Sequence, residues 1–226
     1  CCIIVFMNLS ENIKQKALRL GFDIVGITDA SPIEPRQSQM LRDWVEKKCP
    51  ADMKYMHRNF EKRTSPTALV KNAESVVCLA INYNPPKLKE PAALGRAGRV
   101  ANYALYEDYH SFIKKRLHPL KDYITSIAES EPKCKLCVDS VPIAERALAQ
   151  RAGLGFIGKN HMLINPKLGP QLFLAEIITD LSLEADQPLD EACQRCSKCI
   201  EACPTGALLP DGTFDAAKCI SYLTIE

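Results

Sequence analysis

Four cysteines near the C-terminal end constrain this chain more than any other feature. They are Cys193, Cys196, Cys199 and Cys203, and Pro204 follows the last of them. The C-x2-C-x2-C-x3-C-P spacing is the bacterial pattern for [4Fe–4S] clusters, in which the first three thiolates hold one cluster and the fourth ligates a different one. Structural zinc is the alternative, but a zinc site pairs two cysteines and then needs a distant second pair. The run therefore predicts a protein that transfers single electrons.

Length and charge set broad limits on the rest of the chain. It has 226 residues, of which 46% are hydrophobic, and this suits one large domain or a large domain with a small one. The 29 basic residues nearly balance the 27 acidic ones. Net charge therefore gives no reason to expect nucleic acid, which only a local basic face would bind.

The cysteine content indicates the compartment. Eleven cysteines would suggest disulfides in a short secreted chain, but here five of them lie in or near the cluster pattern. The apolar residues 1–6 are too few for a secretory signal and have no basic flank. No run of about 18 apolar residues occurs, so we expect no membrane span. A reducing cytoplasm fits this cysteine usage best.

Both ends of the chain look unusual. Met7 resembles a natural start, with Ser10 as the N-cap of a first helix, so we interpret residues 1–6 as upstream translation or an expression scar. At the other end the chain stops at Glu226 inside an expected helix, and Cys219 has no obvious partner. We interpret the chain as a truncated reading frame or a fragment.

Hydrophobic periodicity and helix breakers divide the chain into alternating helices and strands. We expect helices at 10–20, at 36–60 with a break at Pro50, at 108–129 with a kink near Pro119, and at 143–152 before Gly153. We expect strands at 23–28, 75–83 and 134–139, a loop at 85–99, and a hairpin of 161–165 with 171–179. The run 75–83 is almost continuously apolar, which is typical of a central strand buried on both faces. This alternation predicts an α/β (α+β) domain.

A glycine-rich segment from Gly153 to Gly158 has the pattern G-x-G-x-x-G. The dinucleotide fingerprint of this form follows a strand and opens a helix. Here the pattern follows the expected helix 143–152 and leads into a turn and a strand, so the order is reversed. We therefore expect a loop that packs against some other bulky cofactor, and not against nicotinamide.

Several other residues have both a functional and a structural interpretation. Asp139 ends an apolar strand, where α/β proteins place their chemistry, but it also suits the N-cap of the next helix. Lys159 follows the glycines, and a solvated side chain is the usual interpretation there. Cys134 and Cys137 have a zinc-like spacing, yet free cysteine is a common core residue, and we favour the core. The four histidines show no metal-ligand spacing.

Taken together, these segments resemble the epoxyqueuosine reductases, and the resemblance runs from Met7 to the last residue. The segments that carry it are Glu61-Lys62-Arg63-Thr64-Ser65-Pro66, Tyr103 with Asp108-Tyr109-His110, Val138-Asp139-Ser140, Glu145-Arg146-Ala147, Arg151 through Asn160, Phe173-Leu174-Ala175-Glu176-Ile177, the cysteine run, and Lys218-Cys219-Ile220-Ser221-Tyr222-Leu223-Thr224. The glycine–lysine–asparagine block together with the cysteine run is the specific part, because few other families carry both in this order.

The resemblance implies a fold, an activity and cofactors. The fold is a cobalamin-binding domain at residues 7–182, similar to that of reductive dehalogenases, followed by a ferredoxin-like [4Fe–4S] module at residues 183–226. The activity is reduction of epoxyqueuosine to queuosine at the wobble position of a tRNA anticodon, the last step of queuosine biosynthesis. The cofactors are cobalamin and two [4Fe–4S] clusters.

The resemblance also implies roles for individual residues. Asp139 would be the proton donor. The residues implied around the cobalamin are Arg63, Tyr103, Asp139, Gly158, Lys159 and Asn160. The implied cluster ligands are Cys193, Cys196 and Cys199 for one cluster, and Cys203 and Cys219 for the other. The family's second cysteine run would follow Cys219 beyond the last residue, so we expect the module to be incomplete.

The implied partners are a tRNA anticodon stem-loop and an electron-donor protein, with the chain acting as a cytoplasmic monomer. Basic residues within 87–99 and 114–121 are the candidates for the tRNA contact, since a net charge of +2 is too small to hold it. Two other interpretations stay open. One is a different cobalamin and iron–sulfur reductase, for example a dehalogenating one, and the other is a non-catalytic ferredoxin-type fragment.

Overall fold

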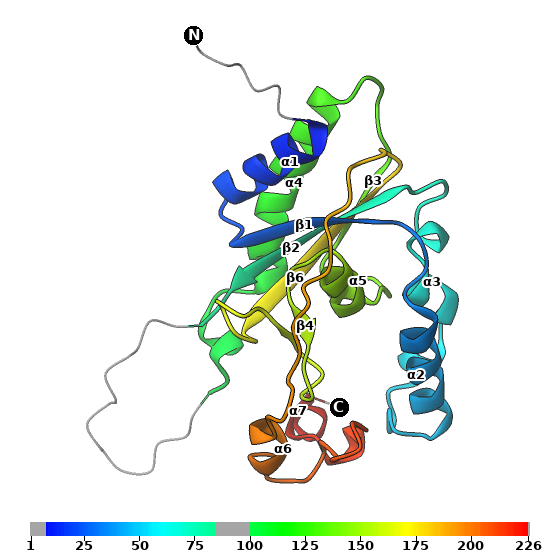
Figure 1. Cartoon of the computed structure of the whole chain (residues 1–226), viewed down its shortest axis with the longest axis vertical. Coiled ribbons are helices and arrows are strands. Elements are labelled where there is room, and N and C mark those ends of the chain that lie inside the picture. The colour runs from blue at the N-terminus through cyan, green and yellow to red at the C-terminus, as the bar shows by residue number, and fades with distance from the viewer. Residues whose placement is uncertain (1–7, 85–99, 226) are drawn as a thin grey trace, which may run out of the picture.

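A four-stranded sheet forms the centre of the computed structural model, which describes residues 8–84 and 100–225 (Figure 1). Its strand order is β1-β2-β6-β3, and each neighbouring pair is antiparallel. The strands are β1 (Ile24–Asp29), β2 (Ser75–Asn82), β6 (Leu172–Thr179) and β3 (Cys134–Cys137). A separate small sheet pairs β4 (Phe156–Ile157) with β5 (Leu163–Ile164). The antiparallel pairing makes this an α+β arrangement within the expected fold class.

The expected central strand is confirmed. β2 lies between β1 and β6, with Ala80 opposite Ile24 and Ser75 opposite Thr179. Every residue of β2 except the last, Asn82, is buried. A strand with neighbours on both edges and helices on both faces presents no polar face to water, and this explains its unbroken apolar sequence.

Helices cover both faces of the sheet (Figure 1). Helix α1 packs with α4 over one face, where Ile13, Leu117 and Leu79 of β2 share a buried cluster. Helix α5 packs on the opposite face, where Leu148 joins Cys78 of β2 in a second cluster. The helices and 3-10 turns are α1 (Leu9–Arg19), α2 (Pro35–Glu46), η1 (Lys54–His57), α3 (Phe60–Thr64), η2 (Pro66–Ala68), η3 (Asn102–Leu105), α4 (Tyr109–Ile127), α5 (Glu145–Arg151), α6 (Lys198–Glu201), η4 (Ala216–Lys218) and α7 (Ile220–Ile225).

The start of α1 differs from the prediction. The N-cap is Asn8, whose side chain accepts a hydrogen bond from the N–H of Glu11, and the assignment of Ser10 as N-cap is wrong. Ser10 lies inside the helix and is buried. Its hydroxyl accepts a hydrogen bond from the N–H of Glu184, in the segment that follows β6. Both residues can cap a helix, so the sequence alone did not separate them.

Two other helices also differ in detail. The expected helix 36–60 is represented by α2, which ends at Glu46, before Pro50. Helix α4 runs through Pro119 as one element. The expectations for residues 1–6 and for the loop 85–99 concern parts of the chain outside the described residues.

The predicted hairpin of 161–165 with 171–179 is wrong. β5 pairs with β4, whereas β6 enters the main sheet between β2 and β3. The turn between them exists, because Asn165 and Gly169 exchange backbone hydrogen bonds of 3.1 and 2.8 Å. The strands on its two sides go to different sheets, which hydrophobic alternation does not specify.

The cysteine-rich segment lies against α2 and the residues that follow it. The indole N–H of Trp44 donates to the carbonyl oxygen of Phe214 at 2.5 Å. The N–H of Ala216 donates to the carbonyl oxygen of Cys49 at 3.0 Å. These contacts join two parts of the chain that are far apart in sequence.

The acidic segment before the cysteines runs along the outer edge of the sheet. The N–H of Asp186 donates to the carbonyl oxygen of Ile27 in β1 at 2.8 Å, and Asp186 Oδ2 accepts the N–H of Ile27 at 2.8 Å. Lys14 of α1 pairs with Asp186 Oδ1 at 2.6 Å. The segment is therefore docked on the domain up to this point.

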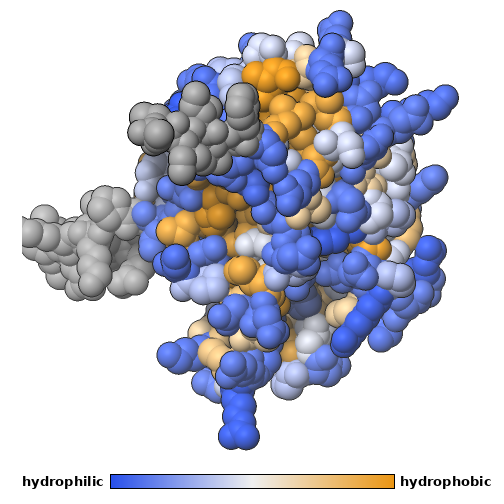
Figure 2. Space-filling model, turned by 45° about the horizontal axis from the view of Figure 1, so that its top comes forward, coloured by the Kyte–Doolittle hydropathy of each residue, from blue (hydrophilic) through white to orange (hydrophobic). Residues whose placement is uncertain are grey.

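Hydrophilic side chains cover most of the face drawn in Figure 2, with hydrophobic side chains visible between them. Within residues 8–84 and 100–225, none of the helices combines the length and the apolar character that crossing a membrane requires.

Candidate active site

Asp139 lies on a sharp turn between β3 and α5. Its φ is 53°, in the left-handed region, and the N–H of Ser140 donates to the carbonyl oxygen of Val138 at 2.5 Å. Aspartate tolerates this region better than most side chains, although it is strained there. The N–H of Asp139 donates to Glu145 Oε1 at 2.8 Å. Because α5 begins at Glu145 with Ala144 as its N-cap residue, the N-cap interpretation of Asp139 is wrong.

The carboxylate of Asp139 faces the first turn of α4. Tyr109 donates its hydroxyl to Asp139 Oδ2 at 2.5 Å, and His110 Nε2 lies 3.4 Å from the same oxygen. On its other side, His110 Nδ1 lies 2.8 Å from Asp108 Oδ1. Hydrogen bonds from His110 and Ser111 lower the pKa of Asp108 to about 2, so Asp108 is ionised and orients the imidazole.

A row of aromatic rings extends from His110. Tyr109 stacks on His110 with ring centroids 4.1 Å apart, and on Phe173 of β6 at 4.6 Å. Phe173 contacts Tyr83 at 4.4 Å. Tyr103 lies in η3 and is exposed, and its charge adds to the burial that raises the pKa of Tyr83. The row lies beside the aspartate, and its rings pack on one another.

Arg63 reaches the same turn from α3. Its carbonyl oxygen accepts the N–H of Ala144 at 2.9 Å, which ties α3 to the start of α5. Its Nη2 lies 3.5 Å from the carbonyl oxygen of Tyr55, whereas its Nε is buried and has no hydrogen-bond partner among the described residues. Burial lowers the pKa of Arg63. A buried guanidinium donor without a protein acceptor fits a ligand that brings an anionic or carbonyl oxygen.

The glycine-rich segment follows α5 and opens no helix, as predicted. A Cβ atom on Gly155 would lie 2.4 Å from the carbonyl oxygen of Ile164, so only glycine lets these backbones approach. The N–H of Gly158 donates to the carbonyl oxygen of Met162 at 2.9 Å. Asn160 Oδ1 accepts the N–H of Met162 at 3.1 Å, so this side chain stabilises the loop itself.

Lys159 connects the glycine loop to the cysteine run. Its backbone N–H donates to Cys193 Sγ at 3.4 Å. Its ammonium donates to the carbonyl oxygens of Cys196 at 2.8 Å and Gln194 at 3.1 Å. The side chain is therefore held by the cysteine segment, which differs from a freely solvated lysine.

The cysteine donors have the chemistry expected of cluster ligands. Hydrogen bonds from backbone N–H groups, chiefly that of Leu208, lower the pKa of Cys203 to about 7, which favours the thiolate that iron binds. In the described part of the chain, no group of three or more His, Cys, Asp or Glu side chains is arranged to hold a metal ion. The assignment of these cysteines to iron therefore rests on their spacing in the sequence and on the chemistry of their thiols. The predicted ligands are all free thiols: Cys193, Cys196, Cys199, Cys203 and Cys219.

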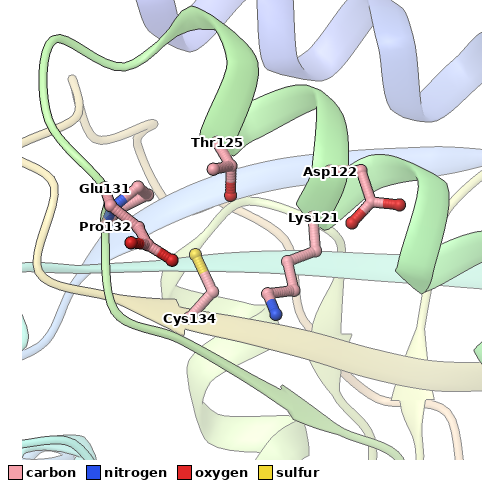
Figure 3. Close-up of a pocket in the computed structure, with 6 residues that line it drawn as sticks. All are labelled: Lys121, Asp122, Thr125, Glu131, Pro132 and Cys134. Carbon is pink, nitrogen blue, oxygen red and sulfur yellow. The ribbon is translucent and has the colours of Figure 1, made fainter.

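The other cysteine pair belongs to the core, as favoured from the sequence. Cys137 is fully buried in β3, and burial raises its pKa, so it is an unreactive thiol. Cys134 is half-buried, and burial raises its pKa too. It lines a pocket that contains none of the residues predicted for the cofactors or for catalysis, although Lys121 belongs to the range 114–121 predicted for the tRNA contact (Figure 3). The lining residues are Lys121, Asp122, Thr125, Glu131, Pro132 and Cys134.

Four residues of this region had no function assigned from the sequence: Tyr109, His110, Glu145 and Glu176. Glu176 is fully buried in β6, and neither carboxylate oxygen has a hydrogen-bond partner among the described residues. Burial, and then the charge of Glu145, raises the pKa of Glu176. An acidic residue inside an apolar strand was the available signal for it.

Comparison with known proteins gives consistent results. A family model described as "Epoxyqueuosine reductase QueG, DUF1730" matches residues 63–140, and one described as "4Fe-4S double cluster binding domain" matches residues 192–226. The epoxyqueuosine reductase of Cyclobacterium marinum is 42% identical over 220 residues, which cover 96% of this chain and 69% of that protein.

Solved structures give the same assignment. The epoxyqueuosine reductase of Streptococcus thermophilus matches with a TM-score of 0.89 and 31% identity, over 97% of this chain and 59% of that chain. An epoxyqueuosine reductase solved with an epoxyqueuosine-modified stem loop of tRNA-Tyr matches with a TM-score of 0.82 and 32% identity, over 96% of this chain and 57% of that chain. The present chain thus spans little more than half of these solved proteins.

The expected likeness to reductive dehalogenases is confirmed at the level of the fold. A catabolic reductive dehalogenase matches with a TM-score of 0.50 and 20% identity, over 92% of this chain and 24% of that chain. Among the two enzyme classes considered from the sequence, the greater similarity is thus to the epoxyqueuosine reductases.

Proposed function

Because this chain belongs to the epoxyqueuosine reductase family, we propose that it holds the reducing cofactors, and supplies a proton, for the reduction of epoxyqueuosine to queuosine in a tRNA anticodon. One observation carries the proposal: the Asp139 turn, the glycine loop and the cysteine run form one connected region. Helix α5 leads from the Asp139 turn to the glycine loop. Lys159, at the end of this loop, donates hydrogen bonds to the cysteine run.

The proposed reaction determines how many electrons and protons this region has to supply. Converting an epoxide to an alkene breaks both carbon–oxygen bonds and releases the oxygen as water. The conversion therefore consumes two electrons and two protons. Iron–sulfur clusters supply electrons one at a time, which suits the cysteine run.

Asp139 is the proposed proton donor. Its side chain is 61% exposed, so it can reach a ligand bound outside the turn. Tyr109 and His110 both lie at Oδ2, so we assign the transferred proton to Oδ1. Burial and the hydrogen bond to Asp139 raise the pKa of Tyr109, so its hydroxyl holds the carboxyl in place without competing as an acid.

Cobalamin is proposed to bind between Arg63, Tyr103, Asp139 and the loop from Gly158 to Asn160. The unpartnered Arg63 Nε and the aromatic row beside Asp139 support this placement. When bound, reduced cobalamin supplies a strongly nucleophilic, electron-donating cobalt centre. The chain's part is to bind and orient the cofactor.

The cysteines are proposed to hold two [4Fe–4S] clusters. Cys193, Cys196 and Cys199 would ligate one of them, and Cys203 and Cys219 would contribute to the other. We place the boundary between the cobalamin-binding domain, residues 7–182, and the cluster module, residues 183–226, at the start of the docked acidic segment.

The proposed substrate is the anticodon stem-loop of a tRNA carrying epoxyqueuosine, by analogy with the relative solved with such a stem loop. Its phosphates would contact basic residues of α4 within 114–121; the second candidate patch, 87–99, lies outside the described residues. We further propose that an electron-donor protein reduces the clusters, and that the chain acts as a monomer in the cytoplasm, where thiols stay reduced.

Replacing Asp139 tests the proposal. Asp139→Asn keeps the shape but removes the transferable proton, so conversion of epoxyqueuosine to queuosine should fall by roughly 10²-fold or more. Activity is measured on a modified stem loop after anaerobic reconstitution with cobalamin, iron and sulfide. Retained cobalt is measured in the same samples, so lost chemistry is separated from lost cofactor.

Asp122→Asn, at an exposed position on α4, is the matched control and should leave conversion unchanged. Wild-type conversion by Asp139→Asn would contradict the assigned acid. A wild-type protein that retains cobalamin and the iron of both clusters yet converts no substrate would contradict the proposed function itself.

A further inference from the structure

A hydrogen-bonded turn in the glycine loop contacts a second turn in the cysteine run. The first turn spans Gly158 to His161, whose N–H donates to the carbonyl oxygen of Gly158 at 2.9 Å. The second spans Cys193 to Cys196, whose N–H donates to the carbonyl oxygen of Cys193 at 2.9 Å. Lys159, the second residue of the first turn, connects the two turns through its backbone and through its side chain.

The backbone of Lys159 provides a hydrogen-bond donor to a predicted cluster ligand. The hydrogen bond that closes its own turn uses only the Gly158 carbonyl and the His161 N–H. The N–H of Lys159 is therefore left for another acceptor, and it donates to Cys193 Sγ at 3.4 Å. A Cβ atom on Gly158 would lie 2.4 Å from Ile164 Cδ1, so the loop is tightly packed at this point and holds the donor in place.

The side chain of Lys159 stabilises the turn between the first two cysteines. Its ammonium donates to the carbonyl oxygen of Cys196 at 2.8 Å and to that of Gln194 at 3.1 Å. Gln194 has a φ of 45°, in the left-handed region that residues other than glycine seldom adopt. A backbone in this region costs free energy, which surrounding contacts have to offset. The two hydrogen bonds from the ammonium are contacts of this kind.

Contacts on both sides of the cysteines hold the run against the glycine loop. Before the cysteines, a Cβ atom on Gly153 would lie 2.6 Å from the carbonyl oxygen of Gln187, so the linker passes directly over the glycine-rich segment. After the cysteines, the ring of Phe214 lies 5.6 Å from that of His161, two residues beyond Lys159. The chain therefore brings the cysteines to Lys159 by contacts that involve no metal.

We propose that Lys159 is a positioning residue for the first iron–sulfur cluster, which sets the Cys193–Cys196 turn before iron binds and favours the reduced state of the cluster. The inference rests on the proposed function, which assigns Cys193, Cys196 and Cys199 to this cluster. Reduction adds one electron, taken from the proposed electron-donor protein, and neither forms nor breaks a bond. The added negative charge is stabilised by an N–H donor at a ligand sulfur and by a cation beside the ligand loop.

Two other roles for Lys159 fit these contacts less well. A freely solvated lysine would not bind two backbone carbonyls of one turn. A direct contact with cobalamin, which the family resemblance implies, would require the ammonium to leave the carbonyls of Gln194 and Cys196. The glycine loop can still border cobalamin, but the acceptors of this ammonium belong to the cysteine run.

The first test uses the chain without cofactors. Lys159→Met keeps the length of the side chain and removes the ammonium. Hydrogen–deuterium exchange of residues 193–197 should become about tenfold faster, since a hydrogen bond to a charged group contributes free energy of that order. Exchange of β2, residues 75–82, should not change, which shows that the domain remains folded.

Lys198→Met is the matched control for this test. Lys198 is exposed and lies within the cysteine run, so the variant loses the same charge nearby without losing the hydrogen bonds of Lys159. Exchange of residues 193–197 should stay close to that of the wild type. Equal exchange in Lys159→Met and wild type would overturn the positioning role.

The second test measures the cluster after anaerobic reconstitution, by a redox titration followed by electron paramagnetic resonance. In Lys159→Met the ratio of reduced to oxidised first cluster at a fixed potential should fall about tenfold, which is about 59 mV for a one-electron couple. Lys159→Arg keeps a cation and N–H donors, so it should retain most of the wild-type potential. An unchanged potential in Lys159→Met, or an equal shift in Lys198→Met, would overturn the inference.

Failure of the inference and failure of the proposed function give different results. If the wild-type protein binds no iron, the proposed assignment of the cysteines fails, whatever Lys159 does. If the wild-type protein binds iron and converts epoxyqueuosine while Lys159→Met matches it in both deuterium exchange and potential, the proposed function stands and the role of Lys159 is refuted.

Discussion

The two faces of the central sheet are built differently. The face covered by α1 and α4 is filled by aliphatic side chains such as Ile113, Leu117 and Ile177. The face covered by α5 carries all the fully buried ionisable side chains of the described residues, Cys78, Cys137 and Glu176. The Asp139 turn leads from β3 directly into α5, while its carboxylate contacts the first turn of α4, so the candidate site lies where the two faces meet. Both faces bury an apolar cluster, and the α5 face in addition buries a carboxyl group without a hydrogen-bond partner among the described residues, which costs stability.

The largest expected effect tests the aliphatic face. Leu117→Ala removes a fully buried side chain of α4 and should lower the free energy of unfolding by about 2–5 kcal/mol, through lost burial and the cavity left behind. Urea denaturation measures the change. Leu18→Ala, at a position that is 42% exposed, is the control and should change stability by about 0.5 kcal/mol or less. Equal effects of the two changes would mean that this face is not the main source of stability.

The pH dependence of stability tests the other face and should be a smaller effect. The pKa of Glu145 rises from 4.5 to about 7 on folding. A raised carboxyl pKa favours the protonated folded state, so its contribution is full below pH 4.5 and is lost as pH rises through about 7. Glu145→Gln should therefore flatten the stability profile between these values, as measured by urea midpoints at several pH values. A profile identical to that of the wild type would show that burial does not perturb this carboxyl.

The smallest expected effect concerns tRNA on the α4 side. Lys114 is exposed, whereas the ammonium of Lys115 already lies 3.3 Å from Glu107. If Lys114 contacts a phosphate, Lys114→Ala should reduce the slope of log affinity against log salt by about 0.7–0.9. Lys115→Ala should change the slope less. Fluorescence anisotropy with a labelled stem loop measures both, and equal slopes in wild type and Lys114→Ala would exclude this contact.

The fold was predictable where one local pattern decides the outcome. The residues of β2 are apolar on both sides of the strand, so this strand is stable only at the centre of a sheet that is covered on both faces. The pairing of β6 was not predictable, because its sequence suits a local hairpin as well as a strand between β2 and β3. Strand alternation fixes which side chains share a face, and leaves the choice of partner strand to packing of the whole domain.

The site was predictable only in part. Asp139 was recognisable because it ends an apolar strand, and Lys159 because it comes directly after the glycine-rich segment. The cysteines were recognisable by their cluster-binding spacing. Glu145 was hidden, since an acidic residue in the first turn of a helix is common for electrostatic reasons alone. Tyr109 was hidden as well, because its role depends on a contact 30 positions away in the chain.

The docked acidic segment has a consequence for how this domain meets other chains. β1 is an edge strand, and an edge strand exposes backbone groups that another strand can pair with. Asp186 occupies both backbone groups of Ile27, its N–H through a side-chain oxygen and its carbonyl through a main-chain N–H. A second chain could extend the sheet at Ile27 only after Asp186 had detached. The acidic segment that connects the domain to the cysteine run therefore also protects the β1 edge from pairing with a strand of another chain.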